Sequence, residues 1–103
     1  MIAIVAAVPE ELAAVRRRLE GSRDVAAGTV RVSVGRIAGR EVALGIAGDG
    51  PLRAQAMIAA LLAEHRCSSL IGIGVAGGLT DDLLLGRLVV ADTVCDTSGR
   101  PCR

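Results

Sequence analysis

The 103-residue sequence contains no phenylalanine, tyrosine, tryptophan or lysine. Without an aromatic ring, no side chain of this sequence can stack on a nucleobase or a sugar. Without lysine, the sequence has no amine for Schiff-base catalysis and lacks the lysine of a phosphate-binding P-loop. These residues therefore cannot supply the amine of a Schiff-base enzyme or the lysine of a P-loop enzyme.

Cysteine is also scarce. Cys67, Cys95 and Cys102 are an odd set with no CxxC spacing. Such a set predicts neither a disulfide framework nor a zinc site. We accordingly expect no metal and no cofactor.

The sequence has little excess of charge of either sign. Its 12 basic and 11 acidic residues give a net charge of +1, and its basic residues are scattered apart from Arg16, Arg17 and Arg18. Binding of nucleic acid through a charged surface is therefore disfavoured. The apolar start, residues 2–8, has no positive flank and is too short for a signal peptide or a membrane span. We expect a cytoplasmic protein that contacts no membrane.

What the sequence does contain is an apolar run at residues 70–79 that ends in small residues, with glycines at Gly72, Gly74, Gly77 and Gly78. A continuous apolar run is typical of a strand buried on both faces of a parallel sheet. Glycines at its end allow the chain to turn and allow a ligand to approach the backbone. Ligands of open α/β sheets bind beyond the carboxyl ends of the strands, so the pattern predicts a site here.

The remaining patterns predict an α/β fold. We expect a strand, a helix, a β-hairpin, a second helix and two more strands in that order. Their residues are, respectively, 2–8, a helix from Pro9 that Gly21 and Ser22 close, 29–34 with 41–46, a helix from Pro51 to His65, 70–79 and 87–92. No helix follows the final strand, which is the pattern of a domain cut short.

Two motifs have competing interpretations. The spacing Gly72-x-Gly74-x-x-Gly77, with Asp92 further on, matches a dinucleotide fingerprint and would indicate a nicotinamide-dependent dehydrogenase. However, the residues between Gly77 and the next expected strand are too few for the crossover helix that this fingerprint requires.

Acidic and basic side chains at helix ends also have ordinary structural roles. Glu10 and Glu11 in a first helical turn favour the positive end of the helix dipole. A carboxylate at the tip of the first strand can instead take a proton from an attacking water. His65, near the end of the second helix, is better explained by that position than by catalysis, because no suitably spaced Ser or Cys accompanies it.

Five segments stand in a recognisable order. They are residues 2–8 leading to Glu10 and Glu11, residues 45–50 (Gly-Ile-Ala-Gly-Asp-Gly), the Ala-rich helix through Glu64 and His65, residues 74–79 (Gly-Val-Ala-Gly-Gly-Leu) and residues 86–92 (Gly-Arg-Leu-Val-Val-Ala-Asp). This order resembles that of the nucleoside phosphorylases and nucleosidases, most closely the 5′-methylthioadenosine/S-adenosylhomocysteine nucleosidases. The resemblance implies a three-layer α/β sandwich around a mixed sheet. Residues 1–103 would be the N-terminal part of a single domain, truncated after about half of it.

The resemblance also implies a reaction and a site. The reaction would be hydrolysis of the N-glycosidic bond of a small-molecule purine nucleoside, as in methionine salvage, by a protein that is a homodimer when full length. Glu11 would activate the attacking water. The ribose and purine would be bordered by Gly48, Asp49, Val75, Ala76 and Gly77.

Other functions remain open. Val75 stands where the family often has a hydroxyl, and the family's general acid, ribose-binding Met-Glu pair and base-stacking aromatics lie in a half that is absent here. We therefore expect little activity from this chain alone, and a non-catalytic fragment or dimerisation module is one alternative. A phosphorylase is another. Against it, no arginine precedes the glycine-rich turn, and residues 8–11 lack the Gly-Asp-Pro-x-Arg loop of those enzymes.

Overall fold

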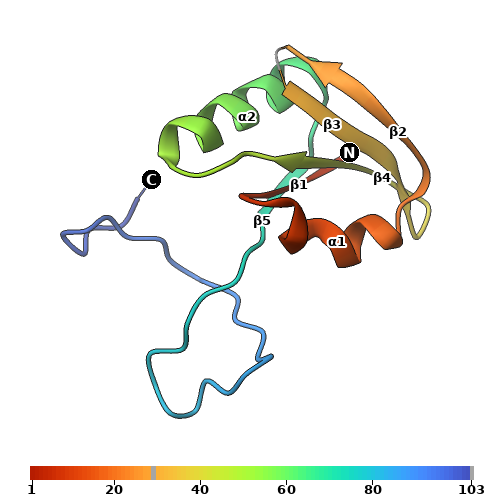
Figure 1. The fold of residues 1–103 in the computed structure, drawn as a ribbon. Coiled ribbons are helices and arrows are strands. Elements are labelled where there is room, and N and C mark those ends of the chain that lie inside the picture. Colours follow the sequence, from red (N-terminus) through yellow and green to blue (C-terminus); the bar gives the residue numbers. More distant parts are fainter. Residues whose placement is uncertain (29, 103) are drawn as a thin grey trace.

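A computed structural model describes residues 1–28 and 30–102 of the chain (Figure 1). It contains a five-stranded mixed sheet with strand order β2-β3-β4-β1-β5. The elements are β1 (Ile2–Ala6), α1 (Pro9–Arg17), β2 (Glu20–Ala27), β3 (Val30–Ile37), β4 (Arg40–Ile46), α2 (Pro51–Glu64) and β5 (Ser69–Gly72). β1 runs parallel to both β4 and β5, whereas β2, β3 and β4 pair antiparallel. The expected mixed sheet is confirmed.

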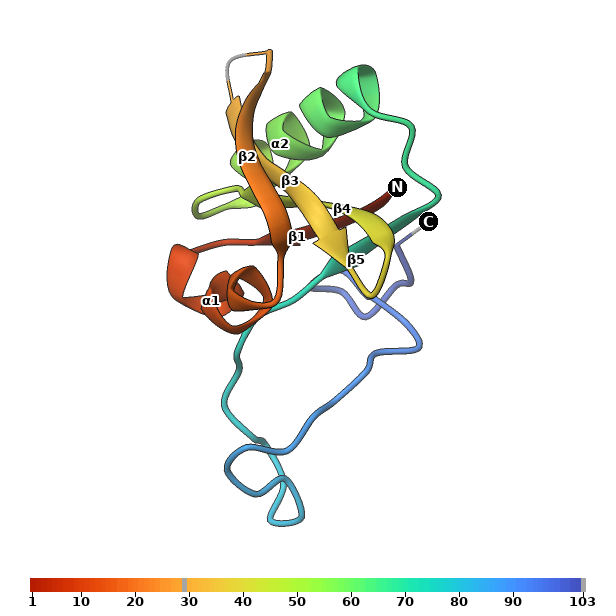
Figure 2. The same cartoon turned by 90° about the vertical axis from the view of Figure 1, so that its right-hand side faces the viewer.

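The two helices cover opposite faces of the sheet (Figures 1 and 2). On one face, Met57 and Leu61 of α2 pack in a cluster that includes Ala3 and Val5 of β1. On the other face, Leu12 of α1 packs in a second cluster. Adjacent residues of a strand point to opposite faces, so β1 contributes to both clusters. The result is the three-layer arrangement that the resemblance implies.

Proline starts both helices, as expected. Pro9 and Pro51 occupy the first turns of α1 and α2, where the missing N–H of proline has no helical partner to lose. α1 ends at Arg17, however, and Gly21 and Ser22 belong to β2. The expectation that these two residues close the helix is wrong.

The strand β2 was not predicted because its sequence has no apolar alternation. In the structure its residues 20–24 are exposed. It forms by pairing with β3, and a register irregularity lies between Glu20 and Arg23. The hairpin of β3 and β4, in contrast, is confirmed. Its two-residue turn, Ala38 and Gly39, has positive φ at both positions, as a type I′ turn requires.

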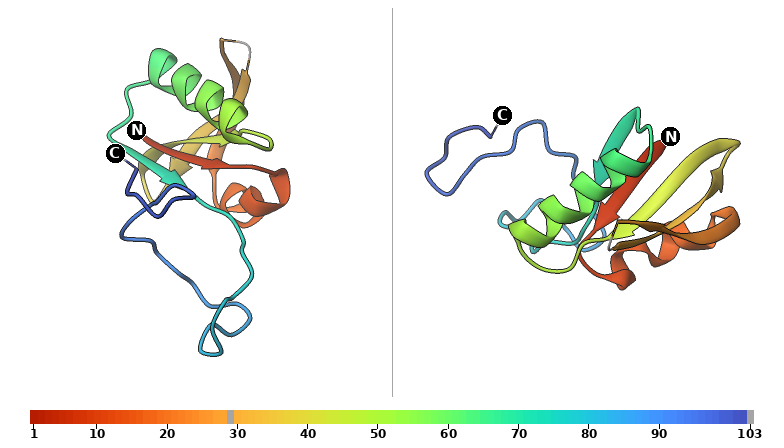
Figure 3. Two further views of the ribbon diagram at one scale, coloured as in Figure 1. Left: turned by 90° about the vertical axis from the view of Figure 1, so that its left-hand side faces the viewer. Right: turned by 90° about the horizontal axis from the view of Figure 1, so that it is seen from above.

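The chain after α2 differs most from the expectation. β5 ends at Gly72 and its four residues are exposed, since none of them belongs to either hydrophobic cluster under the helices. Within the part of the chain that the structure describes, residues 73–102 contain no helix and no named strand, so the strand expected at residues 87–92 is absent. This segment extends away from the sheet (Figure 3).

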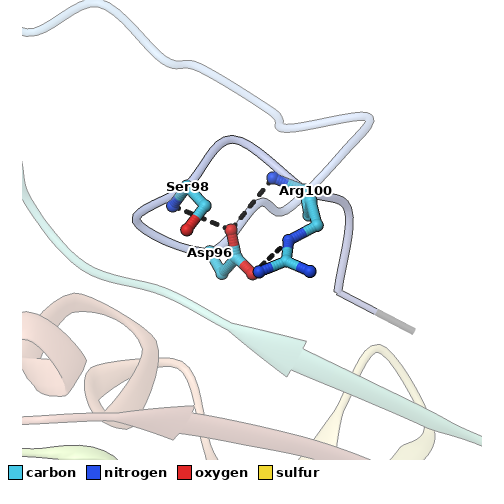
Figure 4. Close-up of polar contacts among 3 residues, drawn as sticks. All are labelled: Asp96, Ser98 and Arg100. Carbon is cyan, nitrogen blue, oxygen red and sulfur yellow. Dashed lines mark hydrogen bonds and ion pairs between the residues drawn. The ribbon is translucent and has the colours of Figure 1, made fainter.

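One local turn orders the end of this segment. The Asp96 carboxylate accepts hydrogen bonds from the backbone N–H groups of Ser98 and Arg100, each at 2.9 Å, and lies 3.7 Å from the Arg100 guanidinium (Figure 4). Cys95 and Pro101 face each other across this turn in an isolated antiparallel bridge. Neither α1 nor α2, the helices of the described residues, has the length and apolar character of a membrane span.

Candidate functional site

The carboxyl ends of the parallel strands β1, β4 and β5 lie side by side. The border of the sheet that these ends form is called the carboxyl edge, and it is distinct from the unpaired sides of the outer strands. Ala6 of β1 pairs with Ile46 of β4, and Val5 pairs with Gly72 of β5. The loops that follow remain attached to β1, since Gly48 donates to the Ala7 carbonyl at 2.9 Å and Ile73 donates to the Val5 carbonyl at 3.0 Å. Ligands of open α/β sheets bind at such an edge. The candidate site lies there.

Glu11 is held between two of these loops. It is the third residue of α1 and is half-buried. Its Oε2 accepts a hydrogen bond from the Val75 N–H at 2.9 Å, and its Oε1 accepts one from the Val8 N–H at 3.3 Å. The second bond satisfies one of the backbone N–H groups that a helix start leaves unpaired, which is a structural role. The first bond joins α1 to residues 74–78, the glycine-rich stretch that follows β5 and is called the glycine segment below.

A carboxylate with these two partners can still accept a proton. Each oxygen has two lone pairs, and the backbone donors occupy one on each oxygen. Backbone N–H groups also orient the carboxylate. Glu10, in contrast, is exposed and has no side-chain hydrogen bond within the described residues. Of the two acids that follow β1, only Glu11 contacts the glycine segment.

An apolar cavity of about 330 Å³ lies at the same edge of the sheet, beside the first turns of α2. Small-molecule sites occupy cavities of about 300–1,000 Å³ and are lined mainly by apolar groups. The lining residues are Val5, Ala6, Ala7, Ala47, Gly48, Gly50, Ala54, Ile58, Leu70, Gly72 and Ile73. Of these residues, Gly48 was predicted from the sequence; Ala54, Ile58 and Ile73 were not, because their apolar side chains have no chemical signature of a site.

The structure brings together only part of the residues that the sequence singles out. Glu11 and Val75 are in contact, and Gly48 lines the apolar cavity. Asp49 is exposed. Ala76 and Gly77 border a different hollow of about 460 Å³, within the extended segment of residues 76–89. A further hollow of about 480 Å³, around Met1 and Glu20, contains none of the predicted residues.

Gly74 belongs to the glycine-rich run, to the dinucleotide fingerprint and to the 74–79 segment of the resemblance, but it was not predicted to be a site residue. A Cβ placed on Gly74 would lie 2.9 Å from the Glu11 Oε2. The dinucleotide interpretation itself receives no support, because Gly77 is not followed by a helix among the described residues. The close approach to Glu11 is a different reason for glycine at this position.

His65 lies away from this edge of the sheet, because it follows the C-terminal end of α2 and precedes β5. His65 follows α2 and its Nε2 is buried with no hydrogen-bond partner among the described residues, while its backbone N–H donates to the Leu61 carbonyl. Within residues 1–28 and 30–102, no three His, Cys, Asp or Glu side chains gather as ligands of a metal ion would.

Similarity to known protein families shows which family this chain belongs to. The model of the phosphorylase superfamily matches residues 1–101, nearly the whole chain. The chain belongs to the phosphorylase superfamily. This agrees with the order of segments on which the resemblance rests.

Solved structures of this superfamily share the fold. The 5′-methylthioadenosine/S-adenosylhomocysteine nucleosidase of Neisseria meningitidis, in complex with methylthio-immucillin-A, is 28% identical, with a TM-score of 0.74 over 81% of this chain and 36% of that chain. The Streptococcus pneumoniae nucleosidase, with a transition-state inhibitor, is 32% identical, with a TM-score of 0.73 over 82% of this chain and 37% of that chain. The Streptococcus pyogenes S-adenosylhomocysteine nucleosidase is 25% identical, with a TM-score of 0.74. The matched region thus spans little more than a third of these relatives.

Proposed function

We propose that this chain takes part in hydrolysis of the N-glycosidic bond of a purine nucleoside of the methylthioadenosine or S-adenosylhomocysteine type, with Glu11 as general base. The observation that carries the proposal is the hydrogen bond from the Val75 N–H to the Glu11 carboxylate. It joins the acid after β1 to the glycine segment after β5, at the edge of the sheet where an apolar cavity also opens. The similarity to nucleosidases supports the same reaction.

The chemistry requires an anionic group near the sugar. The bond between the purine nitrogen and the anomeric carbon breaks, the purine leaves with the bonding electrons, and positive charge builds on the ribose. Water attacks the anomeric carbon while Glu11 takes its proton, and the departing purine takes a proton in turn. A fixed carboxylate stabilises the developing charge, and proton transfer by a positioned group contributes about 10²–10⁴-fold to the rate.

The nucleoside would lie along the carboxyl edge of the sheet. Gly48, Asp49 and Val75 would border its ribose and purine, whereas Ala76 and Gly77 line a separate hollow. The apolar cavity beside α2 is large enough for part of such a ligand and contains Gly48. The proposal also includes a cytoplasmic location, a role in methionine salvage and a homodimeric assembly.

Turnover by this chain alone should be low. In the resemblance, the general acid and the aromatic residues that stack the purine belong to the part of the relatives beyond the matched third. This sequence has no aromatic residue with which to replace them. Vigorous adenine release from methylthioadenosine by the purified chain would contradict this part of the proposal.

Binding can be tested directly on the chain. We expect methylthio-immucillin-A, the ligand of the Neisseria relative, to shift the amide resonances of Gly48 and Val75 in NMR spectra. The amides of the β3–β4 turn, Ala38 and Gly39, are the internal control, since they lie away from the carboxyl edge of β1. Unchanged resonances of Gly48 and Val75 at a millimolar ligand concentration would overturn the proposed site.

Phosphate would distinguish hydrolysis from phosphorolysis. Arg53 is the cation nearest the loop after β4, and its Cδ lies 3.0 Å from the position of a Cβ on Gly48. A phosphorylase would require phosphate for adenine release in a longer homologue. We expect turnover of that homologue to be independent of phosphate, because this loop order places Glu11 rather than an arginine beside the glycine segment.

A non-catalytic module is the second candidate, and one observation favours it. β5 forms one edge of the sheet, and its Leu70 and Ile71 are exposed. An open apolar edge strand invites pairing with another chain. Sedimentation measured beside the ligand titration separates the candidates, because self-association without ligand binding would support the module.

A further inference from the structure

We infer that Gly74 is a positioning residue for the Glu11 carboxylate. The inference rests on the proposed function, in which that carboxylate is the general base. It assigns to Gly74 a role that is separate from turning the chain. The absence of a side chain at position 74 leaves the space through which the carboxylate reaches the Val75 N–H.

The geometry distinguishes this role from an ordinary need for glycine. The φ of Gly74 lies outside the left-handed region, so its backbone conformation is open to other residues. The obstacle to a side chain is a contact instead. A Cβ at position 74 would lie 2.9 Å from the Glu11 Oε2 and 3.7 Å from its Cδ, and among the described residues other than the chain neighbours of Gly74 no further atom lies within 4 Å.

The atom in conflict decides what a substitution would do. Oε2 is the far end of a flexible side chain, so Gly74→Ala can be accommodated when the carboxylate rotates away. The fold should tolerate that movement, because Gly74 itself is exposed and follows the end of β5. The hydrogen bond to the Val75 N–H, at 2.9 Å, is what the movement would break.

Gly77→Ala and Gly72→Ala are matched controls. Both positions have φ outside the left-handed region, and a Cβ at either would meet no atom within 4 Å. Both also lie within the same glycine-rich stretch. A loss that follows Gly74→Ala but neither control must therefore come from the contact with Glu11.

The test is hydrogen exchange at individual amides, expressed as protection relative to the intrinsic rate of each sequence. In Gly74→Ala, we expect protection of the Val75 amide to fall about tenfold, because a hydrogen bond to a charged group is lost. Protection of the Ile73 amide, which donates to the Val5 carbonyl, should stay unchanged and report that the end of β5 is intact. Glu11→Ala breaks the same contact from its other side and should lower Val75 protection equally.

The outcomes separate this inference from the proposed function. Unchanged Val75 protection in Gly74→Ala or in Glu11→Ala would overturn the positioning role, as would an equal loss in Gly77→Ala. Affinity for methylthio-immucillin-A, measured on Gly74→Ala and Glu11→Ala alone, tests the base itself. Loss of Val75 protection with unaltered affinity would uphold the positioning of Glu11 while contradicting its proposed catalytic role.

Discussion

Glu11 and Val75 are 64 positions apart in the sequence, and the Glu11 Oε2 lies 2.9 Å from the Val75 backbone nitrogen. The contact exists because β1 lies between β4 and β5 and runs parallel to both. The residues that follow β1 and β5 therefore emerge at the same edge of the sheet. A nucleoside bound there would meet an acid from one loop and glycine backbone from another.

Removal of the Glu11 charge should weaken binding of a transition-state mimic. Because positive charge would build on the ribose during the proposed reaction, an inhibitor that resembles its transition state should gain from a carboxylate nearby. We expect Glu11→Gln to lower the affinity for methylthio-immucillin-A about 10- to 100-fold, and the affinity for adenine little. Isothermal titration calorimetry measures both.

Glu10→Gln is the matched control for that experiment. Glu10 occupies the same helical turn, so its substitution removes an equal charge from the start of α1. Each of these acids stabilises the helix by about 0.3–1 kcal/mol through the dipole. Equal weakening of inhibitor binding by both variants would mean that Glu11 acts only on the helix.

The packing of α1 against the sheet should contribute as much to the free energy of unfolding as any hydrogen bond of Glu11. Leu12 is 0% exposed and anchors α1, the helix that carries Glu11. We expect Leu12→Ala to lower the free energy of unfolding by about 2–5 kcal/mol. Leu52→Ala, at an 81% exposed position of α2, should change it by less than about 0.5 kcal/mol. Urea denaturation followed by circular dichroism compares the two, and similar midpoints would contradict the assigned core.

Two buried glycines should differ in their tolerance of alanine. A Cβ on Gly35 would lie 2.7 Å from the Glu20 backbone carbonyl, which cannot move without β2. A Cβ on Gly45 would lie 2.9 Å from the Met57 Sδ, which is part of a flexible side chain. Overpacking costs about 1–3 kcal/mol, so Gly35→Ala should lie at or above the upper end and Gly45→Ala near the lower.

Thermal or urea unfolding of both variants measures this difference. Gly72→Ala is the control, because a Cβ there would have no atom within 4 Å. If Gly45→Ala proved the more damaging, α2 would have to be held more rigidly than β2, contrary to the contacts of this structure.

The buried hydroxyl of Ser33 should make its pair with Asp24 asymmetric. Ser33 is buried and its Oγ donates to the Asp24 Oδ1 at 2.9 Å, while Asp24 is exposed. Asp24→Ala leaves a buried donor without its partner and should cost about 1–3 kcal/mol of unfolding free energy. Ser33→Ala leaves only a carboxylate that water can reach, so its cost should be smaller. A double-mutant cycle measures both, and a larger cost for Ser33→Ala would refute the assignment.

Local signals predicted the elements that neighbouring residues determine. Pro9 and Pro51 mark both helix starts, and the Ala38-Gly39 turn marks the β3–β4 hairpin. β2 was not predicted because residues 20–24 have no apolar pattern. These residues form a strand through their pairing with β3. β5 was predicted to be longer and buried, because an apolar run does not reveal whether other residues will pack over the faces of the strand.

The sequence by itself determined both helix starts, the β3–β4 hairpin and the superfamily, because these depend on residue type and local order, and through the resemblance it pointed to Glu11. Only the tertiary structure decided that Glu11 meets Val75, that Gly74 leaves room for this contact, and that Ala76 and Gly77 lie apart from the apolar cavity. The physical reason is the order of strands in the sheet. Pairing between distant segments determines which loops share an edge, and no window of neighbouring residues contains that information.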